Sequence, residues 1–468
     1  MATKRLAAPP KPSLLKQAVI YLEQPVSVAP LVTFRMGFGL VMLFSTLRYI
    51  YMGWVDTQLI NPVMHFHYYG FQWVEPLPGN GMYLVFALMV LATVAITIGW
   101  YYRLAAILFF LCFSYVELID LTFYLNHYYF VSLVSLLLIL VPANRYFSVD
   151  AKRIPRLAGK QVSRWCVGIF KLQIAIVYIY AGLAKINYDW LINALPLSIW
   201  LPAKSSIPLI GFIFEYEITP YLFSWAGMLF DTFIVAFLLW KRTRLLAYLA
   251  VVVFHALTGI LFQIGVFPGV MILGVTIFFS DRTHHNIIAA VNRLLPLKTS
   301  LAAVNNPVSR QPTWQKSALR VVLVTFFLFQ LLFPWRYLLY PGNIFWTEEG
   351  YRFAWRVMLM EKAGTATFYV KDGPDGREGA VRNRKFLHPH QEKQMAMQPD
   401  MILQFAHYLE SYYKKQGMDD PQVRADVRVT LNARPARQLI HPRIDLTEVE
   451  DQWKPKSWIL PFNEKEQP

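Results

Sequence analysis

The sequence predicts a mainly α-helical, polytopic membrane protein with about nine transmembrane helices, followed by a small α+β domain outside the membrane. Of its 468 residues, 56% are hydrophobic and only 16% are charged, whereas soluble domains typically contain about 25% charged residues. The apolar residues occur in long runs, each close to the ~20 residues that a helix needs to cross a bilayer. Beyond residue 340, shorter segments rich in charge replace these runs, which indicates a separate extramembrane domain.

Nine apolar runs are candidate membrane spans. The seventh and eighth belong to one long run that is interrupted at Gly265–Gly269. A helix would lose hydrogen bonds at Pro268, so we expect a turn there. The predicted spans are residues 29–50, 81–99, 104–120, 126–142, 165–186, 218–240, 245–263, 266–280 and 318–338.

The net charge of +16 comes almost entirely from the membrane-spanning part of the chain. Residues 1–339 contain 26 Lys and Arg against 11 Asp and Glu, whereas residues 340–468 contain 19 and 18. With nine spans and an inner N-terminus, 20 of those 26 basic residues fall on the inner side, as the positive-inside rule requires. We therefore expect no nucleic-acid partner, a cytoplasmic N-terminus and an extracytoplasmic C-terminal domain.

The chain is predicted to have three parts. Residues 1–28 form a cytoplasmic, amphipathic segment on the membrane surface, residues 29–339 form the transmembrane domain, and residues 340–468 form the extracytoplasmic α+β domain. The loop at residues 187–217 is apolar but interrupted by prolines. We expect this loop to lie in the outer interface, or to re-enter the membrane and line a cavity.

The C-terminal domain contains signals for strands and for a helix. Thr365–Val370 and Glu378–Arg382 flank a turn rich in Gly, Pro and Asp, which is typical of a β-hairpin. A helix is predicted to begin at Pro399 and to end near Lys415. Residues 423–431 alternate between apolar and polar types, as in a half-buried strand.

The ionisable side chains singled out within predicted spans are Arg35, Lys171, Lys185 and Asp231. Placing a charged side chain in the middle of a membrane helix costs about 2.5–3.5 kcal/mol on insertion scales. Each of these residues therefore needs a structural or functional reason. We expect Asp231 to form an ion pair with an intramembrane base such as Arg35 or Lys171.

Lys185 lies near the outer end of the fifth predicted span, on the same helical face as Tyr178. Its ammonium could extend to the lipid headgroups, as lysines near helix ends do. Alternatively, apolar surroundings could disfavour the charged form and leave a neutral amine able to act as a base. His127 and His255 also lie in predicted spans, where each fits a structural hydrogen bond to a neighbouring helix as well as a role in a site.

The sequence predicts no metal site. Cys112 and Cys166 both lie inside apolar runs, and no Cys/His cluster has the spacing of metal ligands. The intramembrane polar residues together indicate a polar, outward-facing cavity, without specifying a reaction.

Five strings resemble, in order along the chain, segments of the vitamin K-dependent γ-glutamyl carboxylase family. One of them, Ile176–Lys185 with Asp189-Trp190, is similar to the family segment that carries its catalytic lysine. The other four are Asn126-His127 with Ala143–Asp150, Phe254-His255 with Gln263–Phe267, Trp346-Thr347 with Tyr351 and Trp355, and Asp426 with Pro442–Asp445 and Ser457-Trp458. A further segment, Tyr69–Val74, resembles bacterial relatives known as HTTM proteins.

The resemblance implies an enzyme that uses reduced vitamin K or menaquinol, O2 and CO2, without a metal, to γ-carboxylate glutamate in a peptide or protein. In this family, quinol epoxidation generates the strong base that removes the γ-proton. By position, Lys185 would take the proton from the quinol, and Asn126 and His127 would act near the glutamate. The implied cofactor-binding residues are Tyr178, His255 and Trp355.

Other functions remain open on the sequence alone. The chain could epoxidise a quinol with no acceptor or with a different one, or it could bind a quinone or lipid without turnover. A transporter is a further alternative, but it would be expected to show inverted repeats or pairs of broken helices. The HTTM-like segment favours a bacterial inner membrane, whereas a eukaryotic chain would lie in the membrane of the endoplasmic reticulum. Membrane lipid is a partner in either case.

Overall fold

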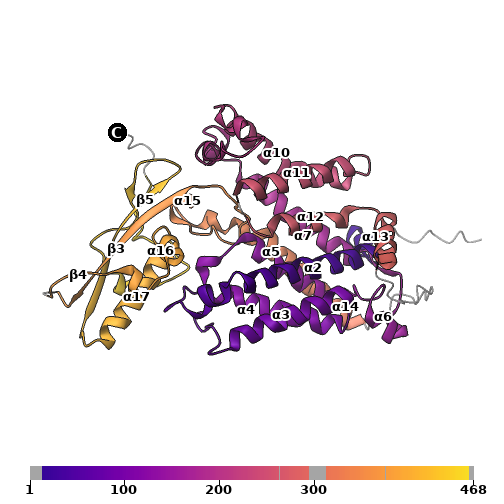
Figure 1. The fold of residues 1–468 in the computed structure, drawn as a ribbon, viewed down its shortest axis with the longest axis horizontal. Helices are drawn as coiled ribbons and strands as arrows, with labels where there is room; N and C mark the ends of the chain where they lie inside the picture. The colour runs from indigo at the N-terminus through magenta and orange to yellow at the C-terminus, as the bar shows by residue number, and fades with distance from the viewer. Residues whose placement is uncertain (1–12, 263, 295–312, 375, 463–468) are drawn as a thin grey trace, which may run out of the picture.

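The computed structural model describes residues 13–262, 264–294, 313–374 and 376–462. A bundle of long helices and a smaller region built on a β-sheet lie at opposite ends of the molecule's long axis (Figure 1). The bundle comes from the N-terminal part of the chain and the sheet from the C-terminal part. The predicted fold class, a mainly α membrane protein followed by a small α+β domain, is confirmed.

Helices occupy all nine predicted apolar runs, but two of them are short. Within the described residues, seven helices are long and apolar enough to cross a membrane. The other two, α5 with 15 residues and α12 with 9, are shorter than the ~30 Å hydrocarbon core at about 1.5 Å per residue. Length and composition therefore support seven spans, and the count of nine is not established. The nine helices are α2 (Ala29–Tyr51), α3 (Gly81–Ile98), α4 (Tyr102–Ile119), α5 (Asn126–Leu140), α7 (Trp165–Ala184), α10 (Thr219–Leu239), α11 (Arg244–Phe262), α12 (Phe267–Val275) and α14 (Thr313–Leu332).

The structure places a turn between α11 and α12, as predicted. Gly265 has a left-handed φ of +62°, which a residue without a Cβ adopts at little cost. Pro268 lies in the first turn of α12, where its missing N–H is not needed. The two helices consequently pack against each other instead of forming one kinked helix.

The inner end of the bundle carries short elements on its surface. Of the predicted amphipathic segment at residues 1–28, residues 1–12 lie outside the described part of the chain. The remainder includes the helix α1, whose large apolar side chains are exposed, as expected of a helix that lies on a membrane. The shorter elements of the bundle include α1 (Leu14–Glu23), β1 (Pro25–Ser27), α6 (Val149–Arg153), β2 (Gln161–Ser163), α8 (Tyr188–Leu191), α9 (Leu197–Trp200) and α13 (Asp281–Leu294).

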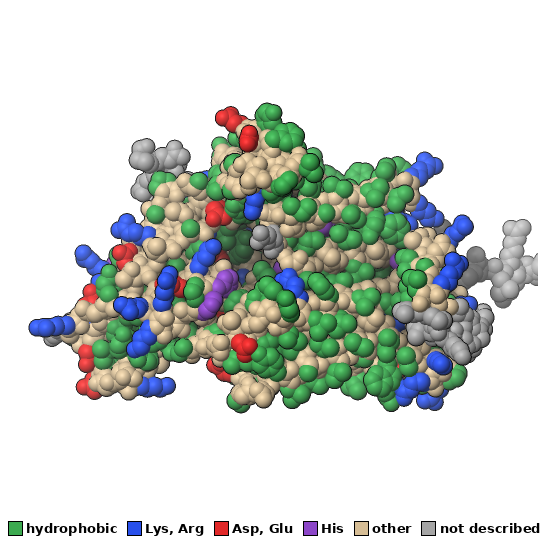
Figure 2. All heavy atoms as spheres, viewed as in Figure 1, with side chains coloured by type: hydrophobic (Ala, Val, Ile, Leu, Met, Phe, Trp, Pro, Cys, Tyr) green, Lys and Arg blue, Asp and Glu red, His purple; other side chains and the backbone are tan. Residues whose placement is uncertain are grey.

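Charged side chains gather at the two ends of the molecule, and the band between them is mainly hydrophobic (Figure 2). Lys and Arg dominate the end that carries α6 and α13, whereas the sheet region carries both signs of charge. A hollow opens between the helices and the sheet region, with hydrophobic side chains in its depth and charged ones at its rim. This distribution is typical of a protein with a lipid-facing belt.

The C-terminal sheet has the order β4-β3-β5-β6. Antiparallel pairing of β3 with β5 runs from Lys362 opposite Leu431 to Asp372 opposite Pro421. Every second side chain of β5 is buried, and β5 packs against α17. The predicted hairpin, helix and alternating strand are all confirmed. The elements are α15 (Ile344–Thr347), β3 (Lys362–Asp372), β4 (Gly379–Ala380), α16 (Pro389–Met395), α17 (Pro399–Lys415), β5 (Pro421–Leu431) and β6 (Arg437–Gln438).

Hydrogen bonds connect the sheet region to the outer ends of the helices. The side-chain amide of Gln391 in α16 donates to Asp120, which follows α4, at 2.7 Å and to the Met64 carbonyl at 2.9 Å. The Asp120 carboxylate also contacts His65 Nδ1 at 3.1 Å. These buried polar contacts fix the position of the sheet region over the bundle.

Candidate active site

Lys185 caps the C-terminal end of α7, where the chain reverses direction. Asn187 then starts α8 and accepts a hydrogen bond from the backbone N–H of Trp190 at 3.0 Å. The reversal brings the Trp190 ring centroid to 5.4 Å from Lys185 Nζ, within reach of a cation–π contact. Only 6% of Lys185 is exposed, so the side chain is enclosed by protein and does not extend toward lipid headgroups.

Asp231 in α10 is the partner of Lys185. Its Oδ2 lies 2.7 Å from Lys185 Nζ, which also donates to the Ala181 carbonyl at 3.3 Å. The close approach of α7 and α10 depends on Gly182, because a Cβ there would clash with the backbone of Thr232. A small residue on α7 thus lets Asp231 reach the lysine.

Asp231 therefore pairs with an intramembrane base, as predicted, but that base is Lys185, and the two bases named as examples, Arg35 and Lys171, were wrong. Arg35 instead donates to the carbonyls of Ile96 and Phe147 at 2.9 and 2.8 Å. Lys171 lies fourteen residues before Lys185 on α7, four turns toward the inner end. Neither base is on the same level of the bundle as the aspartate.

Lys185 and Asp231 line a cavity of about 130 Å3 among α7, α10, α11 and α12. Its walls are mainly aromatic and aliphatic. The apolar loop at residues 187–217 contributes Trp190, Leu197 and Trp200, so this loop lines a cavity, as one of its two predicted placements required. A pocket of this kind accommodates an apolar ring and orients it with a few polar groups.

Tyr178 and His255 are two of those polar groups. The Tyr178 hydroxyl lies 2.8 Å from Nε2 of His255, both residues line the cavity, and each is only 2% exposed. Nδ1 of His255 has no hydrogen-bond partner among the described residues. A ligand that carries oxygen could satisfy this buried nitrogen, whose isolation is otherwise costly.

Asn126 and His127 begin α5, and neither residue lines the cavity. The Phe267 ring is 5.3 Å from the His127 ring and 5.5 Å from the His255 ring, centroid to centroid. Asn126 Nδ2 donates to the Arg356 carbonyl at 3.0 Å. Asn126 therefore holds the C-terminal segment that closes one side of the cavity, and His127 is one aromatic ring away from it.

Trp355 belongs to this closing segment but points away from the cavity. Its ring stacks on Tyr129 at 5.0 Å and meets Phe130 edge-on. Phe353, Trp355 and Met358 all have left-handed φ angles, between 55° and 59°, which residues with a Cβ seldom adopt. With this backbone conformation, Met358 lies in the cavity wall. Trp355 does not line the cavity and packs against α5 through Tyr129.

Two parts of the site were not predicted from the sequence. Val357 and Met358 line the cavity although they belong to the C-terminal part of the chain, and no motif distinguishes them. Asp231 was noticed as a buried charge but was assigned the wrong partner. Within the described residues, no group of three or more His, Cys, Asp or Glu is arranged to hold a metal ion.

An ion pair joins the cavity loop to the sheet region. Asp189 accepts hydrogen bonds from Arg434 at 2.5 and 2.8 Å and from Asn432 at 2.7 Å. Burial acts to raise the pKa of Asp189, but these hydrogen bonds outweigh burial and hold the pKa below its usual value. The loop that carries Trp190 is therefore anchored to the C-terminal domain.

Comparison with protein families gives two matches, which together cover most of the chain. The HTTM domain matches residues 23–282, which contain α2 to α12 and most of the cavity wall. The lumenal domain of vitamin K-dependent gamma-carboxylase matches residues 315–465, which contain the sheet and the segment that closes the cavity. No solved structure matches the chain.

Proposed function

Because the chain belongs to the vitamin K-dependent gamma-carboxylase family, we propose that it γ-carboxylates glutamate in a peptide or protein while oxidising a reduced naphthoquinone with O2. The observation that carries this proposal is the enclosed amine of Lys185, paired with Asp231 in the wall of an apolar cavity. The protein is a membrane protein with an extracytoplasmic domain, and we propose a cytoplasmic N-terminus from the basic inner end.

The cavity fits the ring of a naphthoquinol, either vitamin K or menaquinol. Its aromatic walls suit the apolar ring, and Tyr178 and His255 present polar atoms that the ring oxygens could contact. When bound, the reduced quinone supplies the electrons for O2 and, through its oxidation, a base stronger than any side chain. CO2 is the co-substrate that becomes the new carboxyl group.

Lys185 is proposed to accept the quinol proton, which requires a neutral amine. The Asp231 carboxylate, 2.7 Å away, can take the lysine's own proton. That transfer replaces a buried ion pair by a neutral amine and a neutral acid, and burial penalises the neutral pair far less. Asp231 would thus act through Lys185 as a positioning residue and proton store.

Asn126 and His127 are proposed to act on the glutamate side. Asn126 already holds the closing segment through the Arg356 carbonyl, so its position depends on the C-terminal domain being in place. His127 lies beyond Phe267 from the Lys185 cavity. The two steps would therefore use opposite sides of one aromatic ring, and Trp355 would act only as a support.

Exclusion of water is the further task of the cavity walls. A strong base formed in the cavity would be quenched by solvent, so the reaction needs a dry site. Trp190, Trp200 and Met358 contribute bulky apolar side chains to these walls. A wider cleft of about 530 Å3 between the helices and the C-terminal domain, lined by side chains of both charges, offers room for a peptide.

The test is a reaction of the purified protein in nanodiscs with reduced vitamin K, O2, bicarbonate and a glutamate-rich peptide. Quinone epoxide is followed by chromatography and the added carboxyl group by mass spectrometry. Formation of both products supports the proposal. Epoxide without carboxylation indicates a different acceptor or none, and a folded protein that forms neither product overturns the proposal in favour of quinone or lipid binding.

A further inference from the structure

A second cavity, of about 270 Å3, lies among the outer ends of α2, α3, α4 and α5. The helix η1 (Val55–Ile60) forms one wall, and His390 and Gln394 of α16 contribute to the lining from the C-terminal domain. None of the residues that line the Lys185 cavity lines this one. It is therefore a separate site, formed jointly by both regions of the chain.

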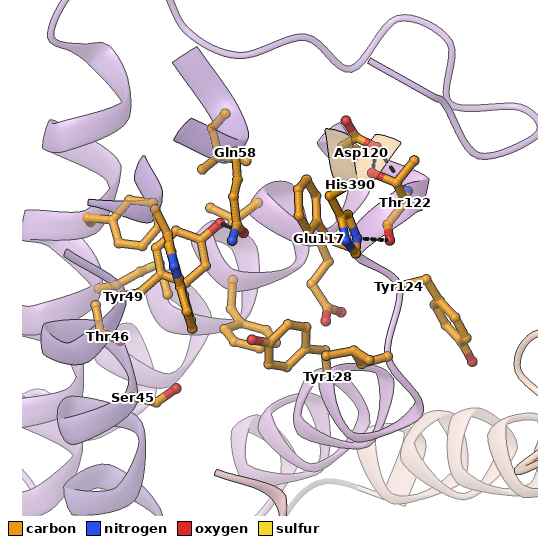
Figure 3. Close-up of a pocket in the computed structure, with 18 of the residues that line it drawn as sticks. Ser45, Thr46, Tyr49, Gln58, Glu117, Asp120, Thr122, Tyr124, Tyr128 and His390 are labelled. Atoms are coloured by element: carbon orange, nitrogen blue, oxygen red, sulfur yellow. Dashed lines mark hydrogen bonds between the residues drawn. The ribbon is translucent and has the colours of Figure 1, made fainter. Parts of the chain in front are cut away.

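Glu117 in the last turn of α4 places a carboxyl group in this cavity. Figure 3 shows its side chain extending from α4 toward Tyr128. Ser132 donates one hydrogen bond to it, at 2.9 Å. Among the described residues, no Lys or Arg lines the cavity, and Glu117 forms no ion pair. The nearby guanidinium of Arg48 stacks on the Trp54 ring at 4.8 Å.

The neighbouring carboxylate of Asp120 has several hydrogen-bond partners, in contrast to that of Glu117. It accepts hydrogen bonds from the backbone N–H and hydroxyl of Thr122 at 2.9 and 2.6 Å, and it contacts Gln391 and His65. His390 is also engaged, with its Nε2 3.1 Å from the Thr122 carbonyl (Figure 3). Of these two carboxyl groups, Glu117 is therefore the one with few partners, a single hydrogen bond from Ser132 among the described residues.

A carboxylate without a counter-charge in an apolar cavity is unstable unless it takes up a proton or a cation. The walls of this cavity suit a bound cation, because they are rich in aromatic rings. A ring attracts a cation over its face, and a carboxylate surrounded by rings is the arrangement that recognises organic ammonium ions. The aromatic lining residues are Tyr49, Trp54, Tyr68, Phe86, Phe113, Phe123, Tyr124 and Tyr128.

We propose that this cavity binds a small organic ammonium ion, with Glu117 as its counter-charge. The inference does not depend on the carboxylase reaction, since the two cavities share no lining residue. The ammonium group could belong to a free amine or to a lipid headgroup, because the cavity lies at the outer ends of the helices. Both sources present the same chemistry to Glu117.

The test uses choline as the probe and, as its neutral match, the alcohol in which a tert-butyl group replaces the trimethylammonium. Full-length protein is placed in phosphatidylglycerol nanodiscs, and binding is measured by calorimetry for wild type, Glu117→Gln and the control Glu75→Gln. Glu75 is an exposed acid of the same outer face that does not line the cavity. The glutamine retains the acceptor for Ser132. A parallel series of nanodiscs that contain phosphatidylcholine tests the lipid as the source.

We expect choline to bind wild type and Glu75→Gln alike, and its affinity to fall at least about tenfold in Glu117→Gln, with no binding of the neutral match. Weaker binding of added choline in phosphatidylcholine nanodiscs would identify the lipid headgroup as a competing source. Equal binding of the neutral match, unchanged affinity in Glu117→Gln, or no binding to folded wild type would overturn the proposal. Tyr128→Leu provides a second variant, expected to weaken choline binding by removing a ring next to the carboxylate.

Discussion

The Lys185 cavity and the Glu117 cavity both place an ionisable side chain among aromatic walls at the outer ends of the helices, but they balance its charge differently. Lys185 has an aspartate from α10 at 2.7 Å, whereas Glu117 has, among the described residues, only a serine hydroxyl. A pair of opposite charges can exchange a proton without changing its net charge, which suits acid–base chemistry. A single charge must find its counter-charge in a ligand or a proton, which suits binding.

The largest effect is expected for Lys185→Ala. Loss of a general base costs about 10²- to 10⁴-fold, so quinone epoxide formation in nanodiscs should fall below detection while the protein remains folded. The matched control is Lys171→Ala, a lysine on the same helix near its inner end, which should keep wild-type activity. An active Lys185→Ala variant would remove the lysine from the mechanism.

Asp231→Asn should have the next largest effect. The asparagine cannot take the lysine's proton, and a hydrogen bond to a charged group contributes about 1.5–3 kcal/mol, so kcat should fall about 10- to 100-fold. KM for the quinol should change little. Asp231→Glu should recover part of the rate. Equal losses in the asparagine and glutamate variants would instead indicate a structural role in holding α7 against α10.

His127→Ala is predicted to separate the two products. Because His127 lies behind Phe267 and outside the Lys185 cavity, carboxylation should decrease about tenfold or more, with epoxide formation close to wild type. Both products are measured in the same reaction. Equal loss of epoxide and carboxylated peptide would show that the two steps do not use opposite sides of the ring.

The smallest effect is expected at the junction of the two regions. The pKa of Asp189 is lowered in the folded protein, so its ion pair stabilises the protein above the carboxyl group's ordinary pKa, and this contribution is lost as the pH falls through the lowered value. Asp189→Asn should therefore reduce the melting temperature at neutral pH, and the difference from wild type should shrink in acid. Asp419→Asn, at an exposed position, is the control. A difference that grows in acid would contradict this sign.

The positions of the helices and of the C-terminal hairpin could be predicted because their causes are local. An apolar run in a membrane must satisfy its own backbone hydrogen bonds as a helix, and the Gly and Pro residues between α11 and α12 end one helix and start another. The lengths of α5 and α12 were overestimated. Their flanking residues are also apolar, so hydropathy alone does not mark the end of the helix.

The contacts between helices could not be predicted in the same way. Asp231 reaches Lys185 because Gly182 lets α10 approach α7, and one sequence does not indicate which of several bases faces an aspartate. Similarly, Glu117 is an ordinary residue at the end of a span until η1 and α16 enclose it. Tyr178 and His255, in contrast, were both singled out and do lie together at 2.8 Å.

The central claim is that Lys185 meets the quinol as a neutral amine because Asp231 has taken its proton. Infrared spectroscopy of the protein at neutral pH tests this directly, since a protonated carboxyl group absorbs separately from a carboxylate. One component of the carboxylic acid absorption should be present in wild type and in Asp400→Asn but lost in Asp231→Asn. Identical spectra for wild type and Asp231→Asn would show that the aspartate stays ionised beside a charged lysine, and would contradict the claim.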